Sequence, residues 1–390
     1  MSRRDVGTDD ERVRVRPGRG TRPRTKTRPA HEDATDGTVL AVDRGRYRVR
    51  TAEGTRVTAV KARELNRTRT AIVVGDEVAL VGDVTGDVDT LARMVAVRER
   101  RTVLRRSAED GDTVGVERPV VANADQLAIV TALADPPPRP RMIDRFLVAA
   151  YDAGMDPLLV LTKADLTGPE ELLAAYAALD ARFVVVGGMD TAGEDTAGPA
   201  DVPAATDGSG ATGTPARDDG LTEVRELLAG RSTVLVGHSG VGKSTLVNAL
   251  VPDAERATSH VNEVTGRGRH TSSSAVALEL PGGGVVIDTP GVRSFGLAHV
   301  SAGSLLAGFA DLAEAAEQCP RGCTHAADSP DCALDAWVVG AREPGTDAAG
   351  GGTAGAHPAD GVAADARAAR LESFRRLAAA LHGGPGTVER

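Results

Sequence analysis

The sequence predicts a multidomain α/β protein with three parts: a small closed β-barrel, a parallel sheet covered by helices, and a short cysteine-containing helical module. Three observations predict this fold class. Short β-like runs fill residues 36–107, strands and helices alternate through residues 108–299, and three cysteines lie close together within residues 300–390. At 390 residues the chain is long enough for each part to have its own core.

The basic residues are concentrated at the N-terminal end. Residues 1–106 hold 25 of the 46 Lys and Arg but 16 of the 55 Asp and Glu, a balance of +9 in a chain of net charge −9. Residues 1–35 have no apolar periodicity, so we expect a disordered basic tail. A basic end on an acidic protein favours contact with a polyanion, although a merely solvated tail explains the same pattern.

Residues 36–107 predict the barrel. Polar and apolar residues alternate in short runs that Gly-Asp and Glu-Gly turns separate: GTVLAV, RYRVRT, TRVTAV, AIVV, EVALVG and ARMVAV. Five or so strands in about seventy residues are typical of a small closed barrel.

Residues 108–299 alternate between buried strands and helices. DQLAIVTAL, PLLVLTKAD and RFVVV are expected strands, with the helices MIDRFLVAAYDAG and PEELLAAYAALDA between them. This rhythm predicts a parallel sheet. Residues 188–219 lack periodicity and predict a low-complexity insertion. The helix LTEVRELLAG and the strand STVLVG then lead into a glycine-rich loop.

The glycine-rich loop GHSGVGKST matches the phosphate-loop pattern G-x-x-x-x-G-K-[ST], in its required place between a strand and a helix. Its glycines let backbone N–H groups turn toward phosphate oxygens. Lys243 adds charge for the outer phosphates, and the Ser244 hydroxyl can ligate Mg²⁺. We expect the whole loop to bind nucleotide: Gly237, His238, Ser239, Gly240, Val241, Gly242, Lys243, Ser244 and Thr245.

Two further segments favour GTP over ATP as the nucleotide. The strand in GGGVVIDTPGV ends in Asp-Thr-Pro-Gly, in which Asp288 can hold Mg²⁺ through water and the Gly291 N–H can meet the γ-phosphate. In GRGRHTSSS, residues 266–274, Thr271 is the candidate switch hydroxyl for Mg²⁺. A polar loop that is rich in Ser by composition explains this last segment as well.

The tetrapeptide Thr162-Lys163-Ala164-Asp165 is the candidate guanine-binding segment. Asp165 would accept hydrogen bonds from the guanine N1–H and amine, which adenine cannot offer, and Lys163 would lie over the base. Thr162 stands where such segments usually have Asn. Ordinary GTPases have this segment after the phosphate loop, whereas here it comes first, which indicates a circularly permuted P-loop GTPase domain.

A possible metal site lies in CPRGCTHAADSPDC. Cys319, Cys323, His325 and Cys332 make a Cys₃His set, which is typical of one structural zinc ion. An odd number of cysteines in one short segment does not predict a disulfide framework. Residues 300–390 therefore predict a helical zinc-binding domain, with a flexible spacer at 344–363 before the helix DARAARLESFRRLAAAL. The leucines of this helix indicate packing, and its arginines suit either packing or RNA.

Barrel, permuted GTPase and zinc segment in this order resemble the RsgA family of ribosome small-subunit-dependent GTPases. The resemblance runs from about residue 36 to 382 without the two spacers. It rests on the Cys₃His set and on ANADQLAIV, IDRFL, LTKADL, GHSGVGKSTLVNAL, GRGRHTSSS and IDTPGV. It implies an OB-fold barrel that touches rRNA, and a protein that binds the small ribosomal subunit late in its maturation, hydrolyses GTP to GDP there, and leaves.

Besides Thr162, the sequence departs from the family pattern in several places. His238 stands where Gln is expected, Ser272 and Ser273 stand where Thr is expected, and the spacing of the zinc ligands is slightly altered. A Ser-Ala loop that would stack on the base cannot be assigned.

RNA contact by the barrel should depend on charge. Tyr47 is the one aromatic residue of this segment, so bases would have little to stack on. Its arginines favour contacts with phosphates: Arg44, Arg46, Arg48, Arg50, Arg67 and Arg69.

The sequence shows no obvious residue that would position the attacking water for GTP hydrolysis. Many GTPases place Gln directly after the Asp-x-x-Gly turn, where this chain has Val292. His270, next to Thr271, is the nearest polar candidate. We therefore expect His270, Thr271 and Lys243 to carry catalysis, slowly in the free protein and faster on the small subunit.

Two other functions stay open at this point: a P-loop ATPase in which TKAD is accidental, and a nucleic-acid-binding protein with a regulatory nucleotide site. The sequence contains no stretch of 18 apolar residues and opens on no charged-then-apolar leader. We expect a cytoplasmic monomer without membrane contact.

Overall fold

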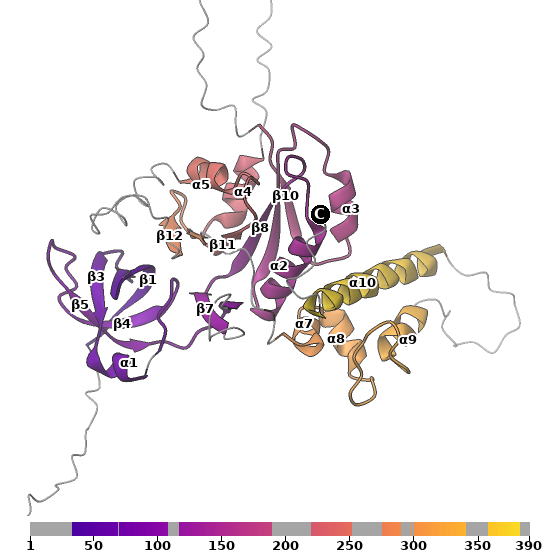
Figure 1. Cartoon of the computed structure of the whole chain (residues 1–390), viewed down its shortest axis with the longest axis horizontal. Helices are drawn as coiled ribbons and strands as arrows, with labels where there is room; N and C mark the ends of the chain where they lie inside the picture. The colour runs from indigo at the N-terminus through magenta and orange to yellow at the C-terminus, as the bar shows by residue number, and fades with distance from the viewer. Residues whose placement is uncertain are drawn as a thin grey trace, which may run out of the picture.

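The computed structural model describes residues 33–68, 70–107, 117–188, 220–251, 275–289, 297, 300–340 and 358–382. Along these residues a barrel, a sheet flanked by helices and a helical module follow one another, as expected (Figure 1). The structure describes only residues 33–35 of the expected tail, residue 188 of the expected insertion and residues 358–363 of the expected spacer.

Five strands close the N-terminal barrel: β1 (Thr35–Asp43), β2 (Arg46–Thr51), β3 (Arg56–Lys61), β4 (Glu77–Gly82) and β5 (Ala92–Val97). Their order is β1-β2-β3-β5-β4, and β4 pairs back onto β1. A short helix, α1 (Arg63–Thr68), follows β3. Alternate residues such as Tyr47 and Val49 point into the core, which confirms the expected OB-like barrel.

One expected strand of the barrel, AIVV at residues 71–74, is wrong. Only Val74 forms a single bridge, to Val121. The reason is the neighbouring carboxylate of Asp76, which is fully buried and accepts the Val73 N–H at 2.8 Å, while Arg100 donates to it at 2.7 and 2.8 Å. A turn held in this way uses a backbone donor that a strand would need.

The central sheet has the order β10-β9-β8-β11-β13-β12. Its strands are β8 (Gln126–Ala132), β9 (Asp156–Thr162), β10 (Arg182–Val185), β11 (Ser232–Val236), β12 (Val276–Glu279) and β13 (Val285–Asp288). Neighbours are parallel except β12, which runs antiparallel to β13. The parallel sheet is confirmed, whereas β12 has no counterpart among the strands that the sequence predicts.

Helices cover both faces of this sheet. They are α2 (Pro140–Asp152), α3 (Glu170–Tyr176), α4 (Leu221–Leu228) and α5 (Lys243–Leu250). Alternate residues of β8 belong to two different cores: Leu127 and Ile129 pack with α2, and Ala128 and Val130 with α4 and α5. Burial on both faces explains why β8 is apolar throughout.

The barrel is joined to the open edge of the sheet. Ala41 of β1 bridges Val276 of β12, and Arg50 and Arg56 form ion pairs with Glu279. A separate hairpin of β6 (Val103–Ser107) and β7 (Glu117–Ala122) lies between the two parts.

The C-terminal module consists of α7 (Ala302–Leu306), α8 (Ala310–Ala316), α9 (Ala333–Gly340) and α10 (Pro358–His382), and α10 packs along α2 (Figure 1). Phe374 of α10 meets Phe309 edge-on, with ring centroids 5.5 Å apart. Among the described residues, no helix is both long enough and apolar enough to span a membrane.

The arginines of α10 have partners within the chain, which favours packing over RNA contact, the two roles that the sequence leaves open. Arg370 pairs with Asp180 and Asp311, and Arg375 with Asp335. Two further arginines have internal partners: Arg367 stacks on Trp337 and Arg376 on Tyr176. These contacts hold α10 against the rest of the chain, and RNA contact by its arginines stays a prediction.

Candidate nucleotide site and metal centre

The phosphate loop joins β11 to α5, as the sequence predicts. Gly237 lies so close to β8 that a Cβ there would be 2.4 Å from the Val130 carbonyl oxygen. Gly240 and Gly242 have φ angles of 85° and 84°, which suit glycine. No side chain caps α5 at Gly242, so the N–H groups of its first turn are available for phosphate oxygens.

Thr162 connects the candidate guanine-binding segment to the phosphate loop. Its hydroxyl donates to the Val241 carbonyl at 2.7 Å and is 3.3 Å from the Thr131 carbonyl, and the residue is fully buried. The two motifs are 79 positions apart in the chain, yet a direct hydrogen bond joins them. Thr in place of Asn therefore keeps the tetrapeptide attached to the loop.

Lys163 and Asp165 lie on the same edge of the sheet, after β9. Lys163 has a φ of 59°, and its Nζ donates to the Asp135 carbonyl. Asp165 accepts the Gly188 N–H at 3.0 Å, and this bond, followed by one from its own N–H, lowers the pKa of Asp165. The carboxylate is thus kept ionised as an acceptor. Ala164, between them, donates its N–H to the Val186 carbonyl at 3.2 Å.

The segment Val186–Gly188, at the end of β10, is a part of this site that the sequence does not identify. It lies against the tetrapeptide through the two bonds just described, in which its own partners are the Gly188 N–H and the Val186 carbonyl. A Cβ on Gly187 would lie 3.4 Å from the Asp165 N. Because the segment makes these contacts with backbone groups, no pattern of residue types predicts them. The one available signal is that the segment directly follows β10, the strand after β9.

Lys243 and Asp288 face each other from α5 and β13. Lys243 Nζ lies 3.2 Å from Asp288 Oδ1, an ion pair that a nucleotide phosphate and a cation would replace. Apart from this ion pair, the buried Asp288 Oδ1 has no hydrogen-bond partner among the described residues. Ser244 is exposed one position after Lys243. These oxygen donors fit Mg²⁺.

The His238 side chain lies beside α2. Its Nδ1 lies 2.8 Å from the Ser239 carbonyl, and the ring lines a small space beside Met142 and Phe146 of α2. Exposed Ser239 and half-buried Thr245 complete the loop. His270, Thr271 and Gly291 lie outside the described residues, so their roles stay predictions.

The four predicted metal ligands converge. The ligand atoms of Cys319, Cys323, His325 and Cys332 all lie within 4.8 Å of one another. His325 Nδ1 is 3.5 Å from Cys319 Sγ and 3.9 Å from Cys332 Sγ, close to the ~3.5–3.8 Å expected between ligands of a tetrahedral zinc ion. Burial, and then the charge of Arg375, lower the pKa of His325 and so favour the neutral imidazole that binds metals.

The surroundings of the cluster also suit a metal. The Ala333 N–H donates to Cys319 Sγ at 3.3 Å, and Arg375 Nε donates to the His325 carbonyl at 3.0 Å. Such bonds from outside the cluster orient the ligands. The cluster can therefore hold a metal ion, and the bond from Arg375 connects it to α10.

These features define a class: a circularly permuted P-loop GTPase with an N-terminal OB-like barrel and a C-terminal metal-binding module. The family profile described as "RsgA GTPase" matches residues 97–197 and 208–298. The small ribosomal subunit biogenesis GTPase RsgA of Chlorobaculum parvum is 34% identical over 315 residues, 78% of this chain and 92% of its own. The protein of the same name from Pseudomonas fluorescens (strain ATCC BAA-477) is 37% identical over 271 residues, 68% of each chain. The chain belongs to the RsgA GTPase family.

Two solved structures share the fold. YjeQ from Thermotoga maritima has a TM-score of 0.58 and 23% identity, covering 90% of this chain and 99% of its own. YloQ, described as a circularly permuted GTPase, has a TM-score of 0.53 and 20% identity, covering 89% and 97%. With the family match, the chain is a GTP hydrolase, and neither the ATPase nor the protein with a merely regulatory nucleotide site is favoured.

Proposed function

We propose that this protein binds the small ribosomal subunit during late maturation, hydrolyses GTP there and then dissociates. The observation that carries the proposal is the hydrogen bond from Thr162 to Val241, which makes one site of a base-reading segment and a phosphate loop. The names of the relatives, small ribosomal subunit biogenesis GTPases, support the choice of subunit.

The proposed roles follow from the position of each side chain. Asp165 reads guanine, and the segment after β10 borders the base. When nucleotide binds, Lys243 leaves its ion pair with Asp288 and contacts the phosphates instead. His270 positions the attacking water. The GTP-binding residues are Thr162, Lys163, Ala164, Asp165, Gly237, His238, Ser239, Gly240, Val241, Gly242, Lys243, Ser244, Thr245 and Gly291.

Two metal ions complete the proposal. Mg²⁺, held by Ser244, Thr271 and Asp288, would neutralise charge on the phosphates. Zinc is the metal proposed for the Cys₃His cluster, because three thiolates and one imidazole suit a closed tetrahedral zinc site that stabilises a fold. The short separations between His325 Nδ1 and the two thiols support this choice.

We further propose the division of labour along the chain. A basic tail (1–35) and the barrel (36–107) contact rRNA, and the permuted GTPase domain (108–299) binds GTP. Residues 300–390 form a helical domain that binds zinc. Each chain acts as a monomer in the cytoplasm, without membrane contact.

The test is a turnover assay with GTP or ATP, each with and without purified small ribosomal subunits. We expect slow hydrolysis of GTP alone, marked acceleration by the subunits, and little hydrolysis of ATP. Lys243→Ala, which removes the charge for the outer phosphates, is the inactive control. If small subunits do not change the turnover of GTP, the proposal is contradicted. If ATP is hydrolysed as fast as GTP, Asp165 does not select guanine.

A further inference from the structure

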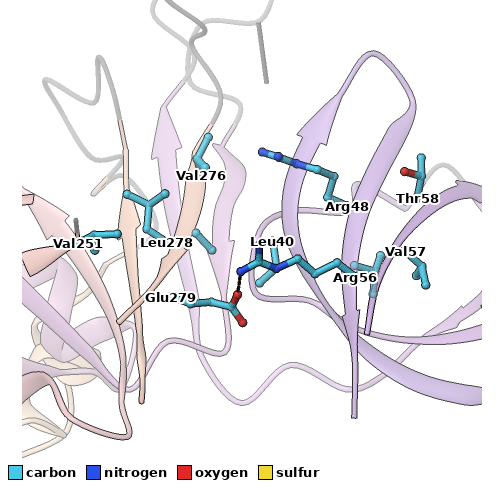
Figure 2. A pocket seen from close by; sticks show the side chains of 11 residues that line it. Leu40, Arg48, Arg56, Val57, Thr58, Val251, Val276, Leu278 and Glu279 are labelled. Atoms are coloured by element: carbon cyan, nitrogen blue, oxygen red, sulfur yellow. Dashed lines mark hydrogen bonds and ion pairs between the residues drawn. The ribbon is translucent and has the colours of Figure 1, made fainter. Parts of the chain in front are cut away.

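A pocket of about 420 Å³ lies between the barrel and the GTPase sheet (Figure 2). Barrel strands β2 and β3 supply Arg48, Arg56 and Thr58, and strand β12 supplies Leu278 and Glu279. None of its lining residues belongs to the nucleotide site. It is therefore a second candidate binding site, built by two domains.

The charge of this pocket is not balanced. Glu279 accepts hydrogen bonds from both Arg50, at 2.7 Å, and Arg56. Arg48 is exposed and forms no hydrogen bond or ion pair with the residues that the structure describes. Although this side chain is open to the pocket, partial desolvation by the surrounding protein lowers the pKa of Arg48, and the nearby charge of Arg56 lowers it further, with Asp43 opposing them. An anion in the pocket would relieve this repulsion.

The other walls of the pocket are apolar. Leu40 comes from the barrel, and Val251, Val276 and Leu278 come from the GTPase domain (Figure 2). The ligand should therefore combine a negative charge with a flat or apolar part. A volume of ~300–1,000 Å³ is usual for pockets that hold small ligands or parts of larger ones.

We propose that this pocket binds one nucleotide of a single-stranded RNA, with its phosphate on Arg48 and its sugar and base against the apolar wall of β12. OB-folds bind oligonucleotides on the face of their second and third strands, and that face lines this pocket. The proposal rests on the proposed function for its RNA partner. It adds that the GTPase strand β12 completes the RNA-binding face of the barrel.

Glu279 has a definite part in this arrangement. A phosphate that approaches Arg56 competes with the Glu279 carboxylate, which already holds that guanidinium. The carboxylate also repels the phosphate directly. Replacing Glu279 should therefore strengthen RNA binding, whereas replacing Arg48 should weaken it. Because the two substitutions should change RNA affinity in opposite directions, they distinguish an RNA-binding pocket from a contact that only holds the two domains together.

The experiment measures fluorescence anisotropy of a short labelled oligouridylate with the full-length protein over a series of salt concentrations. Arg48→Ala should weaken binding about fivefold and reduce the salt slope by about 0.7, the value of one single-strand phosphate contact. Arg48→Lys should keep most of the affinity, and Glu279→Gln should raise it. Arg93→Ala is the matched control, because Arg93 is exposed on β5 and does not line the pocket.

In the oligouridylate assay, any of three results would contradict the proposed pocket: no binding by the wild type, equal losses for Arg48→Ala and Arg93→Ala, or weaker binding by Glu279→Gln with unchanged melting temperature. Co-sedimentation with small subunits keeps this test apart from that of the proposed function. If Arg48→Ala sediments like wild type, the pocket fails and the proposed function stands. If wild type neither sediments nor is accelerated by subunits, the proposed function fails, and oligouridylate still decides on the pocket.

Discussion

The hydrogen bond from Thr162 to the phosphate loop predicts a coupled loss of stability and nucleotide affinity in Thr162→Val. Valine has nearly the same shape but no hydroxyl, so the substitution removes the 2.7 Å bond to the Val241 carbonyl at a fully buried position. Loss of a buried donor costs about 1–3 kcal/mol. In a domain of this size each kcal/mol lowers the melting temperature by about 2–4 °C.

The effect on GTP should come from lost alignment between the two motifs. Part of the binding energy would then have to hold the loop against Asp165, and we expect the Kd of a fluorescent guanine nucleotide to rise about tenfold, or ~1.4 kcal/mol.

Thr102→Val is the matched control for this substitution. The Thr102 hydroxyl donates to the Ala124 carbonyl at the same 2.7 Å, is buried, and lies outside the nucleotide site. Both variants should lose similar stability, measured by thermal unfolding, but only Thr162→Val should lose nucleotide affinity. If the two variants bind nucleotide equally well, the bond does not align the site.

Four further predictions follow from the site and from the sequence. Asp165→Asn should bind GTP weakly and xanthosine triphosphate better in competition assays, and unchanged GTP affinity would mean that this carboxylate does not read the base. The wild type should purify with one zinc by elemental analysis, and Cys323→Ser should lose the metal and melt earlier while still binding GTP; a folded, metal-free wild type would exclude a structural metal. Removing residues 1–106 should weaken small-subunit binding strongly, and binding by the full chain should fall steeply with salt; normal binding by the truncated chain would place the RNA site elsewhere. In turnover assays, His270→Ala should lose the acceleration by small subunits, and acceleration equal to that of wild type would remove this residue from catalysis.

Much of the fold was predictable because its signals are local. The strands β8, β9 and β11 are continuous apolar runs, and the phosphate loop is read from nine consecutive residues. Strand β12 has no such signal. It is only four residues long, Val276–Glu279, and it depends on hydrogen bonds to β13 and a bridge to Ala41. Strand formation of this kind is decided by partners distant in sequence.

The candidate site divides in the same way. Its charged and glycine-rich members were identified by residue type, whereas the Val186–Gly188 segment acts through backbone groups that any residue carries. The ion pair of Arg50 escapes the sequence for a related reason. Arg50 pairs with Glu279, 229 positions away, and its contact with RNA phosphates stays a prediction. No pattern along the chain reports a contact over such a separation.

The hairpin of β12 and β13 connects both additional domains to the nucleotide site. Strand β13 ends at Asp288 beside Lys243, and the C-terminal module follows it along the chain. Its partner β12 would be the exposed edge of the sheet, but the barrel covers that edge through Ala41 and through the ion pairs to Glu279. A ligand held between barrel and β12 and a nucleotide held beside β13 therefore act on the same two strands. If either changes the affinity for the other, linkage requires the effect to be equal in both directions.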